Sequence, residues 1–467
     1  MTCPAKGSKS EKDFCNGGVF NPPGSVFNLQ TQMKVKMLVL LRLLRLKTIA
    51  KRSRGLLRAV SAVAILFSLA GCIKISSTEQ RETPVQPSPP KKGVPSAASA
   101  PSLPQSTANR ELLEQSWVIY RQQFIQEDGR VIDYEASDRS TSEGQAYAML
   151  RAALIDDPVT FGLTLDWAEK NLKRIDAKGK PIDQLWAWKW GKDKGKWGPI
   201  DKNFASDADI DAITALIIAS RRWNRPEYLE LARTKLRDLW NFSTIAGSGN
   251  KRYLLPGPVE AFVPTPSTLY LNPSYFAPYA FRIFAQVDPD HKWLSLVESS
   301  YQVLEQSSKT STVGLPSDWI ALDTKTGRFA PVPPTSKLES VYSFDAYRVW
   351  WRVAWDAEWF KAPEAERYLR TGTKHLQAQW RSSERLPARI SLQGKSTVNY
   401  EATSQYAMLY PALRLIDPEM AEQQLQKKLL PRYKQGIWDD ESAYYTQNLA
   451  WIGLLPPKVI KPELIKP

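Results

Sequence analysis

From residue 108 onward, apolar residues recur every three or four positions, which is the spacing of amphipathic α-helices. The segment "DAITALIIAS" (211–220) carries no charge after its first residue, so we expect a helix that is buried on all sides. The next segment, "RPEYLELARTKLRDLW" (225–240), has apolar residues on one stripe and charges on the other, as an outer helix does. Segments 142–155 and 157–173 repeat this contrast. The pattern predicts buried and outer helices in alternation.

Twelve helices are expected, near 108–126, 142–155, 157–173, 207–222, 225–241, 273–286, 290–306, 343–357, 363–380, 402–415, 417–429 and 442–454. Short links within each buried–outer pair make the two helices antiparallel. Six buried and six outer helices describe an all-α (α/α)6 barrel, with an irregular all-α bundle as the alternative. In such a barrel the buried helices all begin on the same rim.

The charge of the chain is unevenly distributed. Residues 1–72 contain 12 Lys and Arg against 2 Asp and Glu, which accounts for most of the formal net charge of +15. Because this excess lies outside the part expected to fold, it does not indicate a nucleic-acid partner. Residues 73–107 are rich in Pro and Ser and contain few large apolar residues, so we expect a disordered tether. The predicted organisation is a leader (1–72), this tether (73–107) and a folded domain (108–467).

The leader ends in "AVSAVAILFSLAGC" (59–72), whose uncharged run is too short to span a bilayer and fits the core of an export signal. Its last four residues, "LAGC", resemble a bacterial lipobox, where the signal is removed and the cysteine, here Cys72, is acylated. An ordinary signal peptide or a short anchor is the alternative. We expect an exported lipoprotein, periplasmic or on the cell envelope, held to a membrane through its N-terminal lipid. Met33 and Met37 are candidate translation starts.

The residues available for chemistry in the folded part are limited. Its sequence contains no cysteine, and its two histidines, His291 and His375, are far apart in the chain. A cysteine or histidine-rich metal site and a thiol nucleophile are therefore excluded, and we expect no metal and no cofactor. Carboxylates, hydroxyls, lysines and aromatic rings remain.

Acidic residues recur where the buried helices are predicted to begin. The residues at these starts are Glu143, Asp207, Asp209, Tyr275, Asp345, Arg348, Glu401 and Tyr406. Since the buried helices start on one rim, these side chains are expected to line a cleft. Simpler interpretations stay open: Ser142 and Gln145 fit a capping box, Asp207 and Asp209 fit a helix cap, and Asp345 with Arg348 fits an i,i+3 pair.

Two of these carboxylates suit the hydrolysis of a glycosidic bond, which needs an acid on the leaving oxygen and a second carboxylate opposite it. An apolar rim raises a carboxyl pKa, so Glu143 is the candidate acid. The guanidinium of Arg348 favours the ionised form of Asp345, which is the candidate base. The small residues that follow Glu143 are interpreted as room for a sugar chain.

Tryptophan is concentrated in "LWAWKWGKDKGKWGPID" (185–201), which has four Trp among Gly, Asp and Lys. We expect a polar loop in which exposed rings, Trp188 and Trp190 among them, stack on the flat faces of β-linked pyranoses. The alternative is that these rings plug the end of the barrel.

The motifs "TSEGQAYAML", "ASDADIDAITALIIASRRW", "NPSYFAP", "GLPSDW" and "YSFDAYRVWWR" resemble, in this order, the family 8 glycoside hydrolases. "WAWKWGKDKGKWGPIDKNFASDAD" is similar to the branch associated with bacterial cellulose synthesis. The resemblance covers residues 110–455. It implies an (α/α)6 barrel and inverting endo-hydrolysis of β-1,4-glucan, with no metal. We expect a monomer that acts on a β-linked polysaccharide, either alone or beside a cellulose synthase assembly.

The resemblance also assigns roles. It implies that Glu143 is the general acid and Asp345 the general base, and that Asp207 grips the sugar beside the scissile bond. Arg348 would orient Asp345, and Tyr275 would line the same subsite. An aspartate in "FDAYR" favours the branch with cellulases, chitosanases and some xylanases.

Two other classes remain as alternatives. A non-catalytic glycan-binding lipoprotein would keep the cleft without turnover, which the presence of both Glu143 and Asp345 argues against. An (α/α)6 lyase on acidic polysaccharide would need a basic rim, whereas this rim is acidic. Among hydrolases, the sequence leaves cellulose, mixed-linkage glucan, chitosan and xylan open as substrates.

Overall fold

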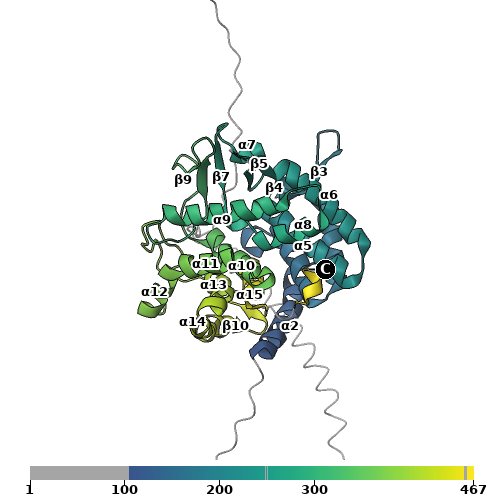
Figure 1. The fold of residues 1–467 in the computed structure, drawn as a ribbon. Coiled ribbons are helices and arrows are strands. Elements are labelled where there is room, and N and C mark those ends of the chain that lie inside the picture. Colours follow the sequence, from purple (N-terminus) through teal and green to yellow (C-terminus); the bar gives the residue numbers. More distant parts are fainter. Residues whose placement is uncertain (1–104, 248, 250, 457–459, 467) are drawn as a thin grey trace, which may run out of the picture. The chain divides into compact units, whose positions relative to one another are not determined.

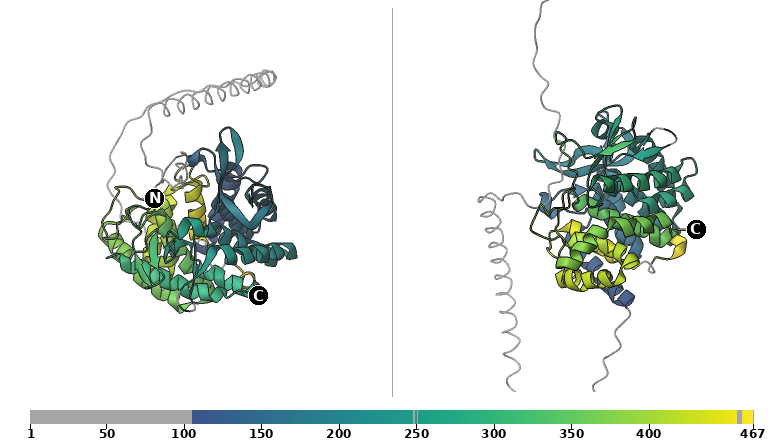
Figure 2. Two further views of the ribbon diagram at one scale, coloured as in Figure 1. Left: turned by 90° about the horizontal axis from the view of Figure 1, so that it is seen from above. Right: turned by 60° about the vertical axis from the view of Figure 1, so that its left-hand side comes forward.

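Six helices form a closed inner ring, in which each helix packs against the next and the last packs against the first. This computed structural model describes residues 105–467 except 248, 250, 457–459 and 467. The ring confirms the predicted (α/α)6 barrel (Figures 1 and 2). Its members are α3 (Ser142–Ile155), α5 (Ser206–Trp223), α8 (Pro278–Val287), α10 (Phe344–Phe360), α13 (Thr403–Ile416) and α15 (Tyr444–Leu454).

An outer helix packs against each inner helix. The outer helices are α2 (Gln105–Phe124) on α15, α4 (Pro158–Asn171) on α3, α6 (Pro226–Ser243) on α5, α9 (Trp293–Thr310) on α8, α11 (Pro363–Gly372) on α10 and α14 (Pro418–Gln424) on α13. The burial pattern explains the two layers: α3 is buried from its first residue to Leu154, whereas α6 buries one stripe.

Tight links join the inner helices to the outer ones. Asp156, Asn224 and Lys361 end α3, α5 and α10 with φ of 70°, 52° and 57°, which stops each helix in the left-handed conformation. A proline follows two residues later in each case and opens the next helix, where its missing N–H costs no hydrogen bond. The short links therefore turn each outer helix back along its inner partner.

Some predicted helices have different bounds. The helix expected at 363–380 is two helices, α11 and α12 (Lys374–Ser383), that meet at Thr373. The helix expected from 273 begins as a 3-10 turn (Pro273–Tyr275), and α8 starts only at Pro278. The helix expected at 417–429 ends as a π-helical turn (Leu425–Leu429). A short helix, α7 (Val259–Phe262), was not expected.

The prediction of helices throughout missed the strands. β3 (Pro181–Asp193) and β4 (Lys196–Phe204) form a hairpin, and β3 also pairs with β1 (Ser140–Thr141) and β2 (Lys173–Ile175). β7 (Thr268–Leu271), β8 (Ile320–Asp323) and β9 (Arg328–Ala330) form a second antiparallel sheet. Figure 1 shows β3, β4, β7 and β9 at the top of the view. Two-stranded pairs join β5 (Thr244–Ala246) to β6 (Arg252–Leu254) and β10 (Tyr433–Lys434) to β11 (Ile437–Trp438).

Several sequence predictions lie outside the described residues: the leader, the lipobox with Cys72, and nearly all of the tether. The first described helix begins at Gln105, three residues before the predicted domain start. Each helix in the described part of the chain is too short or too polar to cross a bilayer.

Candidate active site

Arg348 joins three carboxylates at the rim where the inner helices begin. Its Nη1 donates to Oε2 of Glu143 at 2.7 Å and to Oδ2 of Asp207 at 2.8 Å. Its Nη2 donates to Oδ1 of Asp345 at 2.7 Å. The side chain of Arg348 is only 1% exposed, so these charge-assisted bonds are shielded from water. The first turns of α3, α5 and α10 are therefore tied to one guanidinium, as the prediction of a common rim requires.

The second carboxylate oxygen of Asp345 and that of Glu143 also accept hydrogen bonds. Oδ2 of Asp345 accepts from the side-chain amide of Asn272 at 3.1 Å, and Oε1 of Glu143 accepts from the hydroxyl of Tyr444 at 3.2 Å. Neither Asn272 nor Tyr444 was singled out in the sequence. Both come from segments distant in the chain, which only the closed ring brings to the rim.

Glu143 is buried, with 7% of its surface exposed. Burial raises its pKa to about 7; the charges of Asp207 and Asp345 add to the effect, while Arg348 and the Tyr444 hydroxyl oppose it. A carboxyl group in this state holds a proton near neutral pH and can donate it.

Asp345 differs from the sequence prediction in one respect. Arg348 was expected to dominate and to favour the ionised carboxylate, but burial outweighs the guanidinium and raises the pKa of Asp345 above its ordinary value. The side chain remains 27% exposed, against 9% for Glu143, so Asp345 is the more accessible of the two to water.

The start of α3 is capped by a different residue from the one expected. Thr141, not Ser142, is the N-cap, and its hydroxyl accepts from the N–H of Gly144 at 3.0 Å. Gln145 does not complete a capping box: its amide oxygen accepts from the N–H of Val131 and its nitrogen donates to the carbonyl of Thr164.

The interpretation of the small residues after Glu143 is also wrong. A Cβ placed on Gly144 would lie 3.4 Å from Tyr444 and from the Thr141 hydroxyl, and Ala146 and Ala148 are completely buried. These small side chains permit close packing around α3 and leave no space for a sugar.

A second ion pair repeats the first one turn deeper. Asp211 lies four residues after Asp207, and Arg352 lies four residues after Arg348, so each pair shares one helix face. Nη2 of Arg352 donates to Asp211 Oδ2 at 2.8 Å, and both side chains are at most 1% exposed. Two Arg–Asp ion pairs thus link α5 to α10, one at the rim and one a helical turn below it.

Aromatic rings extend the site in one direction. Tyr275 lies against Arg348, whose Cζ is 5.3 Å from the ring centroid, so it lies at the rim, while its role in binding a sugar stays a prediction. Trp319 follows at 6.3 Å from Tyr275, and Phe262 stacks on Trp319 at 5.7 Å with an interplanar angle of 2°. Trp319 and Phe262 are half-buried and were missed, although Trp319 belongs to the quoted motif "GLPSDW".

The tryptophan-rich segment is a hairpin and not a loop. Trp186 is buried, so it belongs to the core. Trp190 packs on Trp167 of α4 and stacks on Trp197 at 5.1 Å, and the guanidinium of Arg130 lies 4.5 Å from its ring centre. These contacts give Trp190 a structural role, against the prediction that it binds substrate. Trp188 is half-buried on the same strand.

Two further predictions are corrected by burial. Asp209 is completely buried and accepts from the backbone N–H of Trp186. It points away from Asp207, because residues two apart on a helix lie on different faces. Tyr406 is 2% exposed, and its hydroxyl bonds to Glu401 and to the N–H of Leu386. Both side chains are engaged away from Arg348, Asp209 with β3 and Tyr406 with Glu401, so neither joins the rim group that contains Asp207.

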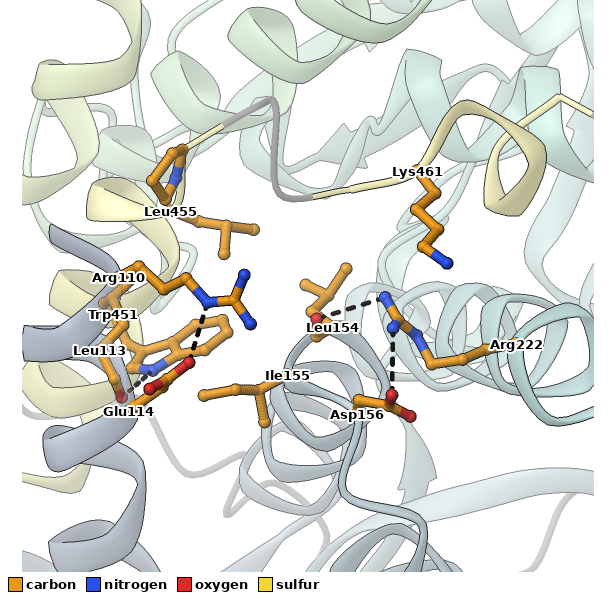
Figure 3. A pocket seen from close by; sticks show the side chains of 11 residues that line it. Arg110, Leu113, Glu114, Leu154, Ile155, Asp156, Arg222, Trp451, Leu455 and Lys461 are labelled. Carbon is orange, nitrogen blue, oxygen red and sulfur yellow. Dashed lines mark hydrogen bonds and ion pairs between the residues drawn. The ribbon is translucent and has the colours of Figure 1, made fainter. Parts of the chain in front are cut away.

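Among the described residues, no group of three or more His, Cys, Asp and Glu side chains could hold a metal ion. A pocket of about 220 Å³ lies away from the rim, at the C-terminal ends of α3 and α15 (Figure 3). Arg110, Arg222 and Lys461 surround it, and Arg222 donates to the carbonyl of Leu154. Arg222 lies at the C-terminal end of α3, where the helix dipole and the carbonyl of Leu154 favour a cation.

Residues 93–456 match the family described as "Glycosyl hydrolases family 8". An endoglucanase of Xanthomonas axonopodis pv. citri (strain 306) is 36% identical over 244 residues, which are 52% of this chain and 60% of that protein. The chain thus spans less than two thirds of this relative. An endoglucanase of Escherichia coli (strain K12) is 30% identical over 342 residues, 72% of this chain and 85% of that protein.

A solved structure shares the fold. The endo-1,4-D-glucanase from Vibrio fischeri ES114 is 29% identical and superposes with a TM-score of 0.61. The superposition covers 73% of this chain and 93% of that one.

Proposed function

The chain belongs to family 8 of the glycosyl hydrolases, and on this premise we propose that it is an endo-acting, inverting β-1,4-glucanase. Glu143 is the general acid that protonates the leaving oxygen. Asp345 is the general base that removes a proton from the attacking water. The relatives named endoglucanase support the glucan as substrate.

One observation carries the proposal: two carboxyl groups in different environments flank a single guanidinium. Glu143 is buried and holds its proton to near pH 7, whereas the side chain of Asp345 is 27% exposed, against 9% for Glu143, and is more accessible to an attacking water. The carboxyl groups of Glu143 and Asp345 lie on either side of the Arg348 guanidinium, each at a hydrogen-bond distance of 2.7 Å. Inverting hydrolysis needs such a pair, with room between for a water and a sugar.

Other residues have supporting roles in this proposal. Asp207 grips the sugar beside the scissile bond, Arg348 orients Asp345, and Tyr275 lines the same subsite. The row Tyr275, Trp319 and Phe262 offers rings on which successive pyranose units stack, which suits cleavage within a chain.

The test is the release of reducing ends from soluble cellulose derivatives, mixed-linkage glucan, chitosan and xylan, measured side by side. The highest kcat/KM is expected on the β-1,4-glucan, with a rapid fall in viscosity that marks internal cleavage. Highest activity on one of the other three polymers would reassign the substrate. Glycan binding without turnover on any of them would instead identify a non-catalytic binding protein.

We also propose that the protein is an exported lipoprotein, anchored through Cys72 and monomeric, and placed beside a cellulose synthase assembly. The motif "LAGC" and the Pro/Ser-rich stretch after it support the anchor. Cys72→Ser is expected to release the protein from the membrane fraction and to abolish labelling with a fatty acid. Unlabelled wild-type protein in the soluble fraction would contradict the anchor without affecting the proposed activity.

A further inference from the structure

Asp318 lies next to the proposed base and has no role in the mechanism above. It belongs to the segment between α9 and β8 and is 8% exposed. Its Oδ1 accepts from the backbone N–H of Ser343 at 3.0 Å and from that of Ala346 at 2.8 Å. Its Oδ2 accepts from the hydroxyl of Ser343. All three donors belong to the start of α10.

These bonds replace an ordinary helix cap. Ser343 is the N-cap of α10, but its own side chain caps no N–H group and donates to Asp318. The first N–H groups of a helix have no partner within the helix. Asp318 supplies the acceptor for Ala346 from a position 28 residues earlier in the chain. The turn that it holds is the one that carries Asp345.

The groups around Asp318 carry negative charge or are neutral. Asp345 faces it from α10 and acts on it with a like charge. The phenols of Tyr342, Tyr347 and Tyr445 interact with it from before α10, from α10 and from α15. Burial raises the pKa of Asp318 to about 7, the charge of Asp345 adds to this, and the hydrogen bonds from Ser343 and Ala346 oppose it.

We propose that Asp318 is a positioning residue for the reaction, which fixes the turn that carries Asp345 through its hydrogen bonds to Ser343 and Ala346. This inference rests on the proposed role of Asp345. A fixed turn keeps the carboxylate of Asp345 at the distance that the attacking water needs.

The test compares kcat and KM of Asp318→Ala and Asp318→Asn. Alanine removes the acceptor for the two N–H groups, so the turn that carries Asp345 is no longer fixed, and kcat is expected to fall by about tenfold or more with KM nearly unchanged. Asparagine keeps an acceptor, so Asp318→Asn is expected to retain most of kcat. Asp323→Ala is the matched control, since Asp323 also accepts from two backbone N–H groups, those of Lys325 and Thr326. Its kcat is expected to match the wild type.

A kcat within about twofold of wild type in folded Asp318→Ala would overturn the proposal, and so would an equal loss of kcat in Asp323→Ala, because a purely structural role predicts a lower Tm without a specific loss of kcat. If Asp318→Ala does not fold, Ser343→Ala replaces it. That change removes one of the three bonds to Asp318, and an unchanged kcat there would also overturn the proposal. Failure of the base itself is distinguishable, since Asp345→Asn would then remain active.

Discussion

Arg348 donates to Glu143 across 205 residues of sequence, and both side chains are buried. Because the same guanidinium also holds Asp207 and Asp345, it fixes the distance between the proposed acid and base. A lysine has one compact ammonium and cannot span three carboxylates. We expect Arg348→Lys to lower kcat by about 10²-fold through misplacement of these groups.

The matched control for that variant is Arg282→Lys. Arg282 also bridges two carboxylates, Asp356 and Glu364, but from α8 and away from the rim. It is expected to lower Tm and to leave kcat within a few-fold of wild type. Equal losses of kcat in the two variants would assign Arg348 a structural role only.

Glu143→Gln tests the proposed acid. The amide preserves the shape of the side chain but has no proton to donate, so turnover is expected to fall by about 10²–10⁴-fold while the fold and glycan binding remain. Glu135→Gln, which changes an exposed glutamate eight residues earlier, is the control with unchanged rates. Residual activity within tenfold of wild type would reject Glu143 as the acid.

The pH profile follows from the raised pKa of Glu143. A general acid must be protonated, so kcat/KM is expected to fall as pH rises through about 7. The folded state also binds this proton more tightly than the unfolded state between the ordinary glutamate pKa and about 7, so ionisation lowers stability as pH rises in this window. The Tm of Glu143→Gln, relative to wild type, should therefore increase from about pH 5 to pH 8. A Tm difference that is constant with pH would contradict the raised pKa.

The stereochemistry of the product tests the base. A base that acts through water needs about 6.5–9.5 Å between the carboxyl groups, whereas a nucleophile needs about 5–5.5 Å. We expect a single displacement, in which β-linked glucan yields α-configured reducing ends. Proton NMR of the anomeric signals in the first minutes of digestion measures this, and Asp345→Asn should be inactive. An initial β-anomer would exclude Asp345 as a general base.

Two tryptophans of one strand are expected to differ. Trp188→Ala should raise KM for long glucans with little change in Tm, as loss of a stacking ring does. Trp190→Ala should lower Tm, because it removes contacts to Trp167, Trp197 and Arg130. Kinetics and thermal unfolding of both variants check this pair. The reverse assignment would restore Trp190 as the substrate-binding ring.

The barrel could be predicted from the sequence because the distribution of polar residues in each helix shows whether the helix is buried on all sides or on one. A run such as 211–220 has no polar face, and its outer neighbour has one, so the two layers could be separated without a structure. Carboxylates at the starts of four buried helices then indicated the rim. Glu143, Asp207 and Asp345 do meet there, whereas Glu401 pairs with Lys428 instead.

The rest of the site was not predicted for two reasons: some contacts are long-range, and the signal of the β3–β4 hairpin was missed. Asn272, Asp318 and Tyr444 make contacts at the rim that no local pattern predicts, although Asn272 and Asp318 belong to the quoted motifs "NPSYFAP" and "GLPSDW". The hairpin had a readable signal: tryptophan at every second position of β3, followed by a two-residue turn, Lys194 and Gly195, with φ of 46° and 84°. The polar composition of the segment favoured a loop instead.

The hairpin limits how this enzyme can be redesigned by grafting. β1, which leads directly into the helix with Glu143, pairs with β3 at Ser140 and Thr141. β4 ends at Phe204, two residues before the helix with Asp207. A transplanted hairpin from another protein would therefore move both carboxylates, whereas exchange of its tip alone would leave them in register. The tip is the interchangeable part, and the strands behind it help to hold the proposed acid and the aspartate beside it.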